Sequence, residues 1–129
     1  RDMSTRRYKW FKLSEFDSPD KEGSGDMMDD AFMQQLDLAR DIAGFPFIIN
    51  SGFRTIEYNR MLINKGYKAS KNSSHVLGHA ADIHCDSSKK RFLLMETLLD
   101  AGYTRLGLGS NFIHVDNDPE KSDLLIWTY

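Results

Sequence analysis

The sequence has one cysteine, Cys85, and no long hydrophobic run. A single cysteine cannot form a disulfide within the chain, so a packed core must hold the fold. No stretch approaches the roughly 18 consecutive apolar residues that a membrane-spanning helix needs, and a membrane span is therefore not expected. Because Cys85 lies in an apolar segment, we interpret its thiol as core packing rather than as a reactive group.

An excess of charge of one sign is also absent. The chain carries 17 Lys and Arg against 19 Asp and Glu, for a formal net charge of -2 and an isoelectric point near 6.1. This balance argues against a nucleic-acid-binding protein. The basic opening segment, residues 1–12, is the exception. It could meet an anionic surface, but we interpret it as a solvated terminus.

The length allows one hydrophobic core but not two. With 129 residues, of which 40% are hydrophobic, we predict a single domain over residues 1–129. Residues 14–28 are rich in Ser, Asp, Gly and Pro, a composition typical of a surface loop. We therefore expect residues 1–28 to form a loop-rich segment packed on the domain.

The remaining residues predict an α+β fold. Helices are expected over 29–43, 55–65 and 86–101, where apolar residues recur at spacings of three and four or capping residues precede the segment, and where Gly44, Gly66 and Gly102 would end each helix. Strands are expected where short apolar or β-branched runs occur, over 45–50, 80–85, 112–116 and 124–129. Residues 51–54 are interpreted as a turn, and Gly107 and Gly109 as the approach to the strand at 112–116.

All four histidines lie in three short segments together with carboxylates. Neutral imidazole is the commonest protein ligand for zinc and an aspartate oxygen is an accepted third ligand. A catalytic zinc needs three protein ligands and one open position. His75, Asp82 and His114 could supply this set. We interpret the other two histidines, His79 and His84, as hydrogen-bonded structural residues.

Strand geometry suggests how these ligands meet. Successive side chains of a strand point to opposite faces, so His114 and Asp116 share one face of their strand. If that strand neighbours the strand that carries Asp82, the ligands converge. His75 lies in the preceding loop, where Gly78 lets the backbone bend and brings the imidazole over Asp82.

Three segments then match a known pattern. In chain order they are Ser51-Gly52-Phe53-Arg54-Thr55, then Ser73-x-His75-x-x-Gly78-x-Ala80-x-Asp82, then Gly107-x-Gly109 followed by Phe112-Ile113-His114-Val115-Asp116. With these segments the sequence resembles the D-alanyl-D-alanine carboxypeptidase-like zinc peptidases, a peptidoglycan-cutting group that includes phage endolysins and shares its fold with the hedgehog signalling domain. The resemblance runs from about Phe11 to Tyr129.

The resemblance implies a small, mostly antiparallel sheet with flanking helices and one Zn²⁺ held by His75, Asp82 and His114. It places Arg54 where a substrate carboxylate is held and Ser73 at a supporting position beside the metal. The implied activity is zinc-dependent hydrolysis of a peptide bond in a peptidoglycan stem peptide, by a carboxypeptidase or an endopeptidase. We expect a monomer that acts on the bacterial cell wall, outside the cytoplasm or as a phage protein released at lysis.

Two interpretations stay open at this point. Many members of the group carry a carboxylate three residues before the last histidine, and here that place is Asn111, which cannot accept a proton. Asp116 is then the nearest candidate for the general acid/base, or it orients His114. Arg54 holds substrate or pairs with a carboxylate of the second predicted helix. A different class is a non-catalytic, zinc-containing binding module of hedgehog type.

Overall fold

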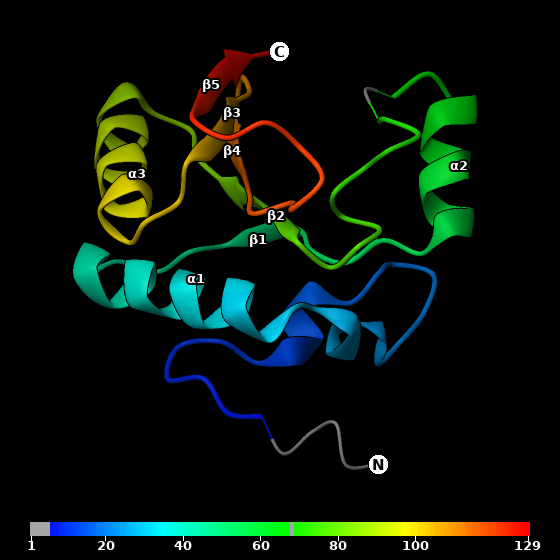
Figure 1. Ribbon diagram of the computed structural model, residues 1–129, viewed down its shortest axis with the longest axis horizontal. Helices are drawn as coiled ribbons and strands as arrows, with labels where there is room; N and C mark the ends of the chain where they lie inside the picture. The colour runs from blue at the N-terminus through cyan, green and yellow to red at the C-terminus, as the bar shows by residue number, and fades with distance from the viewer. Residues whose placement is uncertain (1–5, 68) are drawn as a thin grey trace.

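A five-stranded sheet forms the centre of the computed structural model, which describes residues 6–67 and 69–129 (Figure 1). In chain order the strands are β1 (Ile49–Ser51), β2 (Ala80–His84), β3 (Arg105–Leu108), β4 (Phe112–Asp116) and β5 (Leu125–Thr128). Their spatial order is β1-β2-β4-β3-β5. The pairs β1–β2, β2–β4 and β3–β4 are antiparallel and β3–β5 is parallel. The predicted α+β class with a mostly antiparallel sheet is confirmed.

The predicted helices form close to their expected bounds. They are α1 (Asp30–Ala43), α2 (Ile56–Asn64) and α3 (Ser88–Asp100). Each helix is preceded by an N-cap residue whose side chain accepts a hydrogen bond from a backbone N–H of the first turn. These residues are Asp29, Thr55 and Ser87, in that order. Such caps satisfy donors that have no partner within the helix. Gly44 ends α1 in the left-handed conformation that glycine adopts without strain.

The two faces of the sheet have different roles. Ile83 of β2 and Val115 of β4 belong to a core that also contains Leu36 of α1 and Leu98 of α3. Side chains alternate between the two faces along a strand. Asp82, next to Ile83, and His114, next to Val115, therefore face away from that core. Figure 1 shows α1 and α3 together beside the sheet, whereas α2 lies at the opposite side of the molecule.

The segment before α1 differs from the predicted surface loop. It forms two short 3-10 helices, Leu13–Phe16 and Ser24–Met27, and Phe16 is fully buried in the core. That prediction was wrong because one large aromatic side chain outweighs the polar composition around it: burying a ring of that size favours order over a solvated loop. Phe11, Phe16 and Met28 place parts of this segment in the core, while residues 1–5 lie outside the described residues.

Two strand predictions need correction as well. β1 spans only Ile49–Ser51 rather than 45–50, and β3 was interpreted as a glycine-rich approach, although it is a strand with neighbours on both sides. Among the described residues, no helix combines the length and apolar character needed to cross a membrane.

Candidate metal centre

The three proposed ligands converge on the face of the sheet opposite the core. β2 and β4 are neighbours, and their register places Asp82 directly across from His114. His75 reaches the same point from the loop before β2. One potential ligand atom from each residue lies within 4.8 Å of the others. The predicted convergence of these side chains is therefore present.

Their spacing fits a zinc ion. Asp82 Oδ1 lies 3.2 Å from His75 Nε2 and 3.0 Å from His114 Nδ1. Ligand atoms at zinc–ligand distances of roughly 2.0–2.1 Å on tetrahedral corners are about 3.3 Å apart. Two imidazole nitrogens and one carboxylate oxygen are donors of the kind that a catalytic zinc site uses, and these three could hold the ion.

Backbone groups fix the orientation of His75. Its Nδ1 lies 2.8 Å from the carbonyl oxygen of Gly52. A carbonyl can only accept a hydrogen bond, so Nδ1 carries the proton and Nε2 is free to bind a metal. The backbone N–H of His75 donates to Ser73 Oγ at 3.2 Å. Burial lowers the pKa of His75, despite the attraction of Asp82, and favours the neutral form that ligates metal.

The loop can bring His75 to this position because of Gly78, which has a φ of +76°. A Cβ at Gly78 would lie 2.3 Å from the carbonyl oxygen of Met27. Only glycine accommodates both the left-handed backbone and this close approach. The bend expected from the sequence at Gly78 is confirmed.

Two successive hydrogen bonds hold His114 through Nε2, the ring nitrogen that does not face Asp82. His114 Nε2 lies 2.7 Å from Asp116 Oδ2, and Arg105 Nε donates to Asp116 Oδ1 at 2.6 Å. Only 1% of Asp116 is exposed. Burial alone would raise the pKa of Asp116, but the hydrogen bonds from His114 and Arg105 lower it to about 2. The carboxylate is thus ionised and has partners on both oxygens.

Arg54 lies beside the same centre. Its Nη2 is 3.6 Å from Asp82 Oδ2, its Nε donates to Ser51 Oγ at 3.1 Å, and its Nη1 donates to Asn59 Oδ1 at 3.4 Å. Its contact on α2 is therefore the amide of Asn59 rather than a carboxylate. The guanidinium faces the proposed metal ligands from the irregular segment between β1 and α2, and Ser51, predicted as part of a turn, is the last residue of β1.

A cavity of about 690 Å³ opens over these residues. Arg54, Ser73, His75, Asp82, His114 and Asp116 all contribute to its lining. One wall comes from the end of α2 and the residues after it, including Leu62 and Tyr67. Aromatic side chains also line the cavity and form an aromatic wall, from Phe112 of β4, Trp127 of β5 and Tyr129. This volume is in the range of small-molecule and peptide-binding sites.

The residues interpreted as structural lie elsewhere. His79 Nδ1 lies 2.7 Å from Asn117 Oδ1, and His84 Nε2 is 3.5 Å from Asp86 Oδ2 at the surface. Cys85 is buried, as predicted, and Asn111 is exposed.

Sequence reasoning missed Arg105 and the aromatic wall. The signal for Arg105 was the alternation Arg105-Leu106-Gly107-Leu108-Gly109, which places Leu106 and Leu108 on one face of a strand. Gly107 and Gly109 alternate with these leucines and made a strand look unfavourable, because glycine is depleted in strands. No local pattern marks Trp127, whose place depends on the parallel pairing of β5 with β3.

A comparison with protein families decides the assignment. The model of the peptidase M15 family matches residues 9–116 of the 129-residue chain. The chain belongs to the peptidase M15 family. M15 peptidases are zinc-dependent, so this protein is a zinc metallopeptidase and Zn²⁺ is its cofactor. The match includes the three residues grouped above as a possible metal site. No curated protein matches the chain.

Proposed function

We propose that this M15 peptidase hydrolyses a peptide bond in the stem peptides of peptidoglycan, with zinc held by His75, Asp82 and His114. The observation that carries the proposal is the convergence of these three side chains at an open cavity. A buried structural zinc site would have four protein ligands and no such opening. The sequence resemblance to peptidoglycan-cutting enzymes supplies the substrate class.

The cavity supports a peptide that ends in a carboxylate. Arg54 presents a planar guanidinium that can bind a carboxylate through two parallel hydrogen bonds. It lies next to Asp82, so a carboxylate held there would place a nearby peptide bond over the metal ligands. This arrangement favours release of a terminal residue, such as D-Ala, over cleavage in the middle of a long chain. The aromatic wall offers an apolar surface for the rest of the substrate.

Zinc, when bound, polarises the scissile carbonyl and lowers the pKa of a coordinated water toward about 7. The chain's own residues hold the reacting groups in place. Gly52 and Asp116 fix the two imidazoles, Ser73 holds the backbone of His75, and Arg54 orients the substrate.

Asp116 has two proposed roles. As general acid/base it would accept a proton from water and pass it to the leaving amine. As an orienting group it would accept the Nε2 proton of His114. Its near-complete burial and its partners on both oxygens support the orienting role, because a proton-transfer group needs an oxygen within reach of water or substrate. The general acid/base role stays a prediction.

Incubation of the zinc-loaded protein with purified peptidoglycan, followed by mass analysis of the released fragments, tests the proposal. We expect loss of a terminal D-Ala or release of stem fragments, and no release by His114→Ala. Intact peptidoglycan after incubation with fully zinc-loaded protein would contradict the proposal. Co-sedimentation of that inactive protein with the wall would favour the non-catalytic binding module.

A further inference from the structure

Arg105 is a buried cation next to the metal centre that no role in hydrolysis yet accounts for. It lies at the start of β3 with 8% of its surface exposed. Its Nε donates to Asp116 Oδ1 at 2.6 Å and its Nη1 donates to the carbonyl oxygen of Ser122. Burying a guanidinium is costly unless its charge is compensated and its donors are used. Asp116 compensates the charge and, together with the carbonyl of Ser122, accepts two of the hydrogen bonds.

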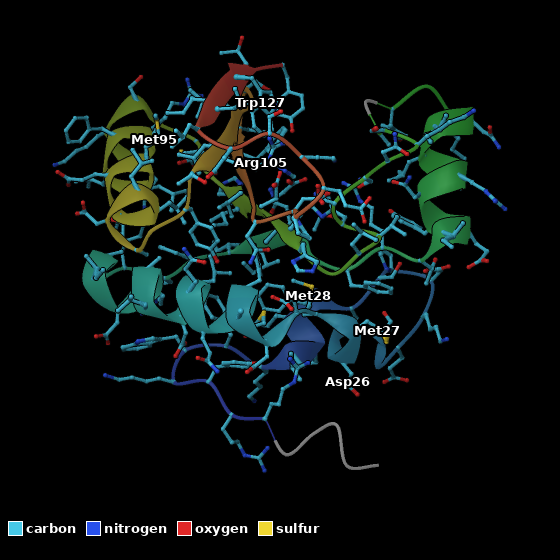
Figure 2. All side chains as sticks on the ribbon, viewed as in Figure 1. Asp26, Met27, Met28, Met95, Arg105 and Trp127 are labelled. Atoms are coloured by element: carbon cyan, nitrogen blue, oxygen red, sulfur yellow. The ribbon has the colours of Figure 1, made fainter. Side chains whose placement is uncertain are left out.

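An indole ring covers the guanidinium. The centroid of the Trp127 ring lies 4.9 Å from Arg105 Cζ, and Figure 2 shows both side chains on the neighbouring strands β3 and β5. Gly107 pairs with His114 on one side and with Trp127 on the other. A Cβ at Gly107 would lie 2.7 Å from Trp127 Nε1, so the glycine leaves room for the indole. Stacking on an aromatic face restricts the plane of the guanidinium.

The fixed guanidinium in turn restricts Asp116. Arg105 and the backbone N–H of Asp118, at 3.2 Å, both donate to Oδ1. The other oxygen, Oδ2, is therefore directed at His114 Nε2. Since a carboxylate only accepts, His114 must carry its proton on Nε2. Nδ1 faces Asp82 Oδ1 at 3.0 Å, at the position of a metal ligand, and a metal ion bound there would take the place of the proton on Nδ1.

We propose that Arg105 is a positioning residue of the zinc site, which acts through Asp116 to set the tautomer and the ring orientation of His114. This inference rests on the proposed ligand set. Arg105 does not touch the metal or the substrate in this role. Its effect is to keep Nδ1 of His114, rather than Nε2, aimed at the metal position before zinc arrives.

Zinc affinity measured by competition with a chromophoric chelator tests the first consequence. Loss of a group that orients a metal ligand by hydrogen bonding typically weakens metal binding by about 10–100-fold. We expect Arg105→Gln to fall in this range. Arg105→Lys should lie between Arg105→Gln and the unmodified protein, because an ammonium keeps the charge but lacks the planar fork. Arg60→Gln, on the exposed surface of α2, is the matched control and should bind zinc normally.

A double-mutant cycle separates positioning from a general loss of structure. If Arg105 acts only through Asp116, then adding Arg105→Gln to Asp116→Asn should weaken zinc binding little further. Independent, multiplying losses in the double variant would contradict the proposal. So would zinc affinity of Arg105→Gln equal to that of the Arg60→Gln control.

The tautomer can be read in the unmodified protein, so the test does not depend on any variant folding. A long-range ¹H–¹⁵N spectrum of the zinc-loaded protein should show His114 protonated at Nε2, with Nδ1 as the metal-bound nitrogen. The reverse assignment would overturn the proposal. His114→Ala keeps the two hypotheses apart. If it retains zinc, the ligand set itself is wrong, and if it loses zinc while Arg105→Gln does not, only the role of Arg105 fails.

Discussion

At the residue scale, each proposed histidine ligand presents one nitrogen to the metal position and has the other held by an acceptor. Gly52 holds His75 and Asp116 holds His114. We expect about one zinc per chain in the purified protein, and little or none in His75→Ala or His114→Ala, because two remaining protein ligands bind zinc weakly. Metal analysis after dialysis checks this. His84→Ala is the control, and full zinc content in both ligand variants would exclude this ligand set.

The role of Asp116 is a second question at this scale. Asp116→Asn keeps the size of the side chain but removes its charge. A general acid/base predicts bound zinc and a loss of about 10²–10⁴ in turnover, whereas an orienting group predicts zinc affinity lower by about 10–100-fold. From its contacts we expect the weaker zinc binding. Zinc occupancy and turnover, measured on the same sample, distinguish the two roles, and an unchanged variant would exclude both.

Arg54 is expected to act on the substrate and not on the metal. We predict that Arg54→Ala retains zinc and fold but loses most of its turnover on a stem peptide. Arg54→Lys should recover only part, since an ammonium cannot form the paired contact of a guanidinium. Kinetics on a peptide and on its C-terminal amide check this: the defect should be large for the free carboxylate and small for the amide. An equal defect on both would remove Arg54 from carboxylate binding.

At the scale of elements, the helices and strands that have clear periodicity or caps can be predicted from the sequence. The helices follow from their caps Asp29, Thr55 and Ser87, whereas the pairing of β2 with β4 entered only as the condition under which the ligand candidates meet, and the structure supplies it. Long-range packing decided the rest. β3 is a strand although Gly107 lowers its intrinsic propensity, because it pairs on both sides. Phe16 orders its segment by burial, which composition alone does not reveal.

The loop that carries His75 offers a stability test with a matched control. Gly78 and Gly44 have nearly the same φ, +76° and +75°. A Cβ at Gly78 meets a backbone oxygen, while one at Gly44 meets nothing within 4 Å. We expect Gly44→Ala to cost about 1 kcal/mol from the left-handed backbone alone. Gly78→Ala should cost more, on the order of 2–3 kcal/mol, and should weaken zinc binding. Equal free energies of unfolding from urea titrations would contradict this account of the loop.

At the scale of the whole molecule, one core connects the segment before α1 with both helices beside the sheet and with β2, β3 and β4. The proposed metal ligands on β2 and β4 lie on the other face of that sheet. The single domain over residues 1–129 and the monomeric state stay predictions. One cooperative unfolding transition and a monomer mass in sedimentation would support them.

This separation of core and metal site predicts how zinc and pH act on the entire fold. The core does not include the ligands, so the zinc-free protein should stay folded, with an unchanged far-ultraviolet spectrum. Added zinc should raise the melting temperature, because a ligand that binds only the folded state stabilises it by about 2.7 kcal/mol at a hundredfold excess over Kd.

Protons compete with zinc for His114. Burial alone would lower the pKa of His114, but hydrogen bonds to Asp116 and Asp82 raise it above its ordinary value. Below that raised pKa the zinc-free protein holds a proton that zinc must displace, so apparent zinc affinity should fall about tenfold for each pH unit lost there and level off above it. The stabilisation by zinc should shrink over the same range. Calorimetric zinc titrations in buffers of different ionisation enthalpy check the sign, since about one proton should be released per zinc bound at pH 6. Absence of proton release there would show that His114 is already neutral before zinc binds.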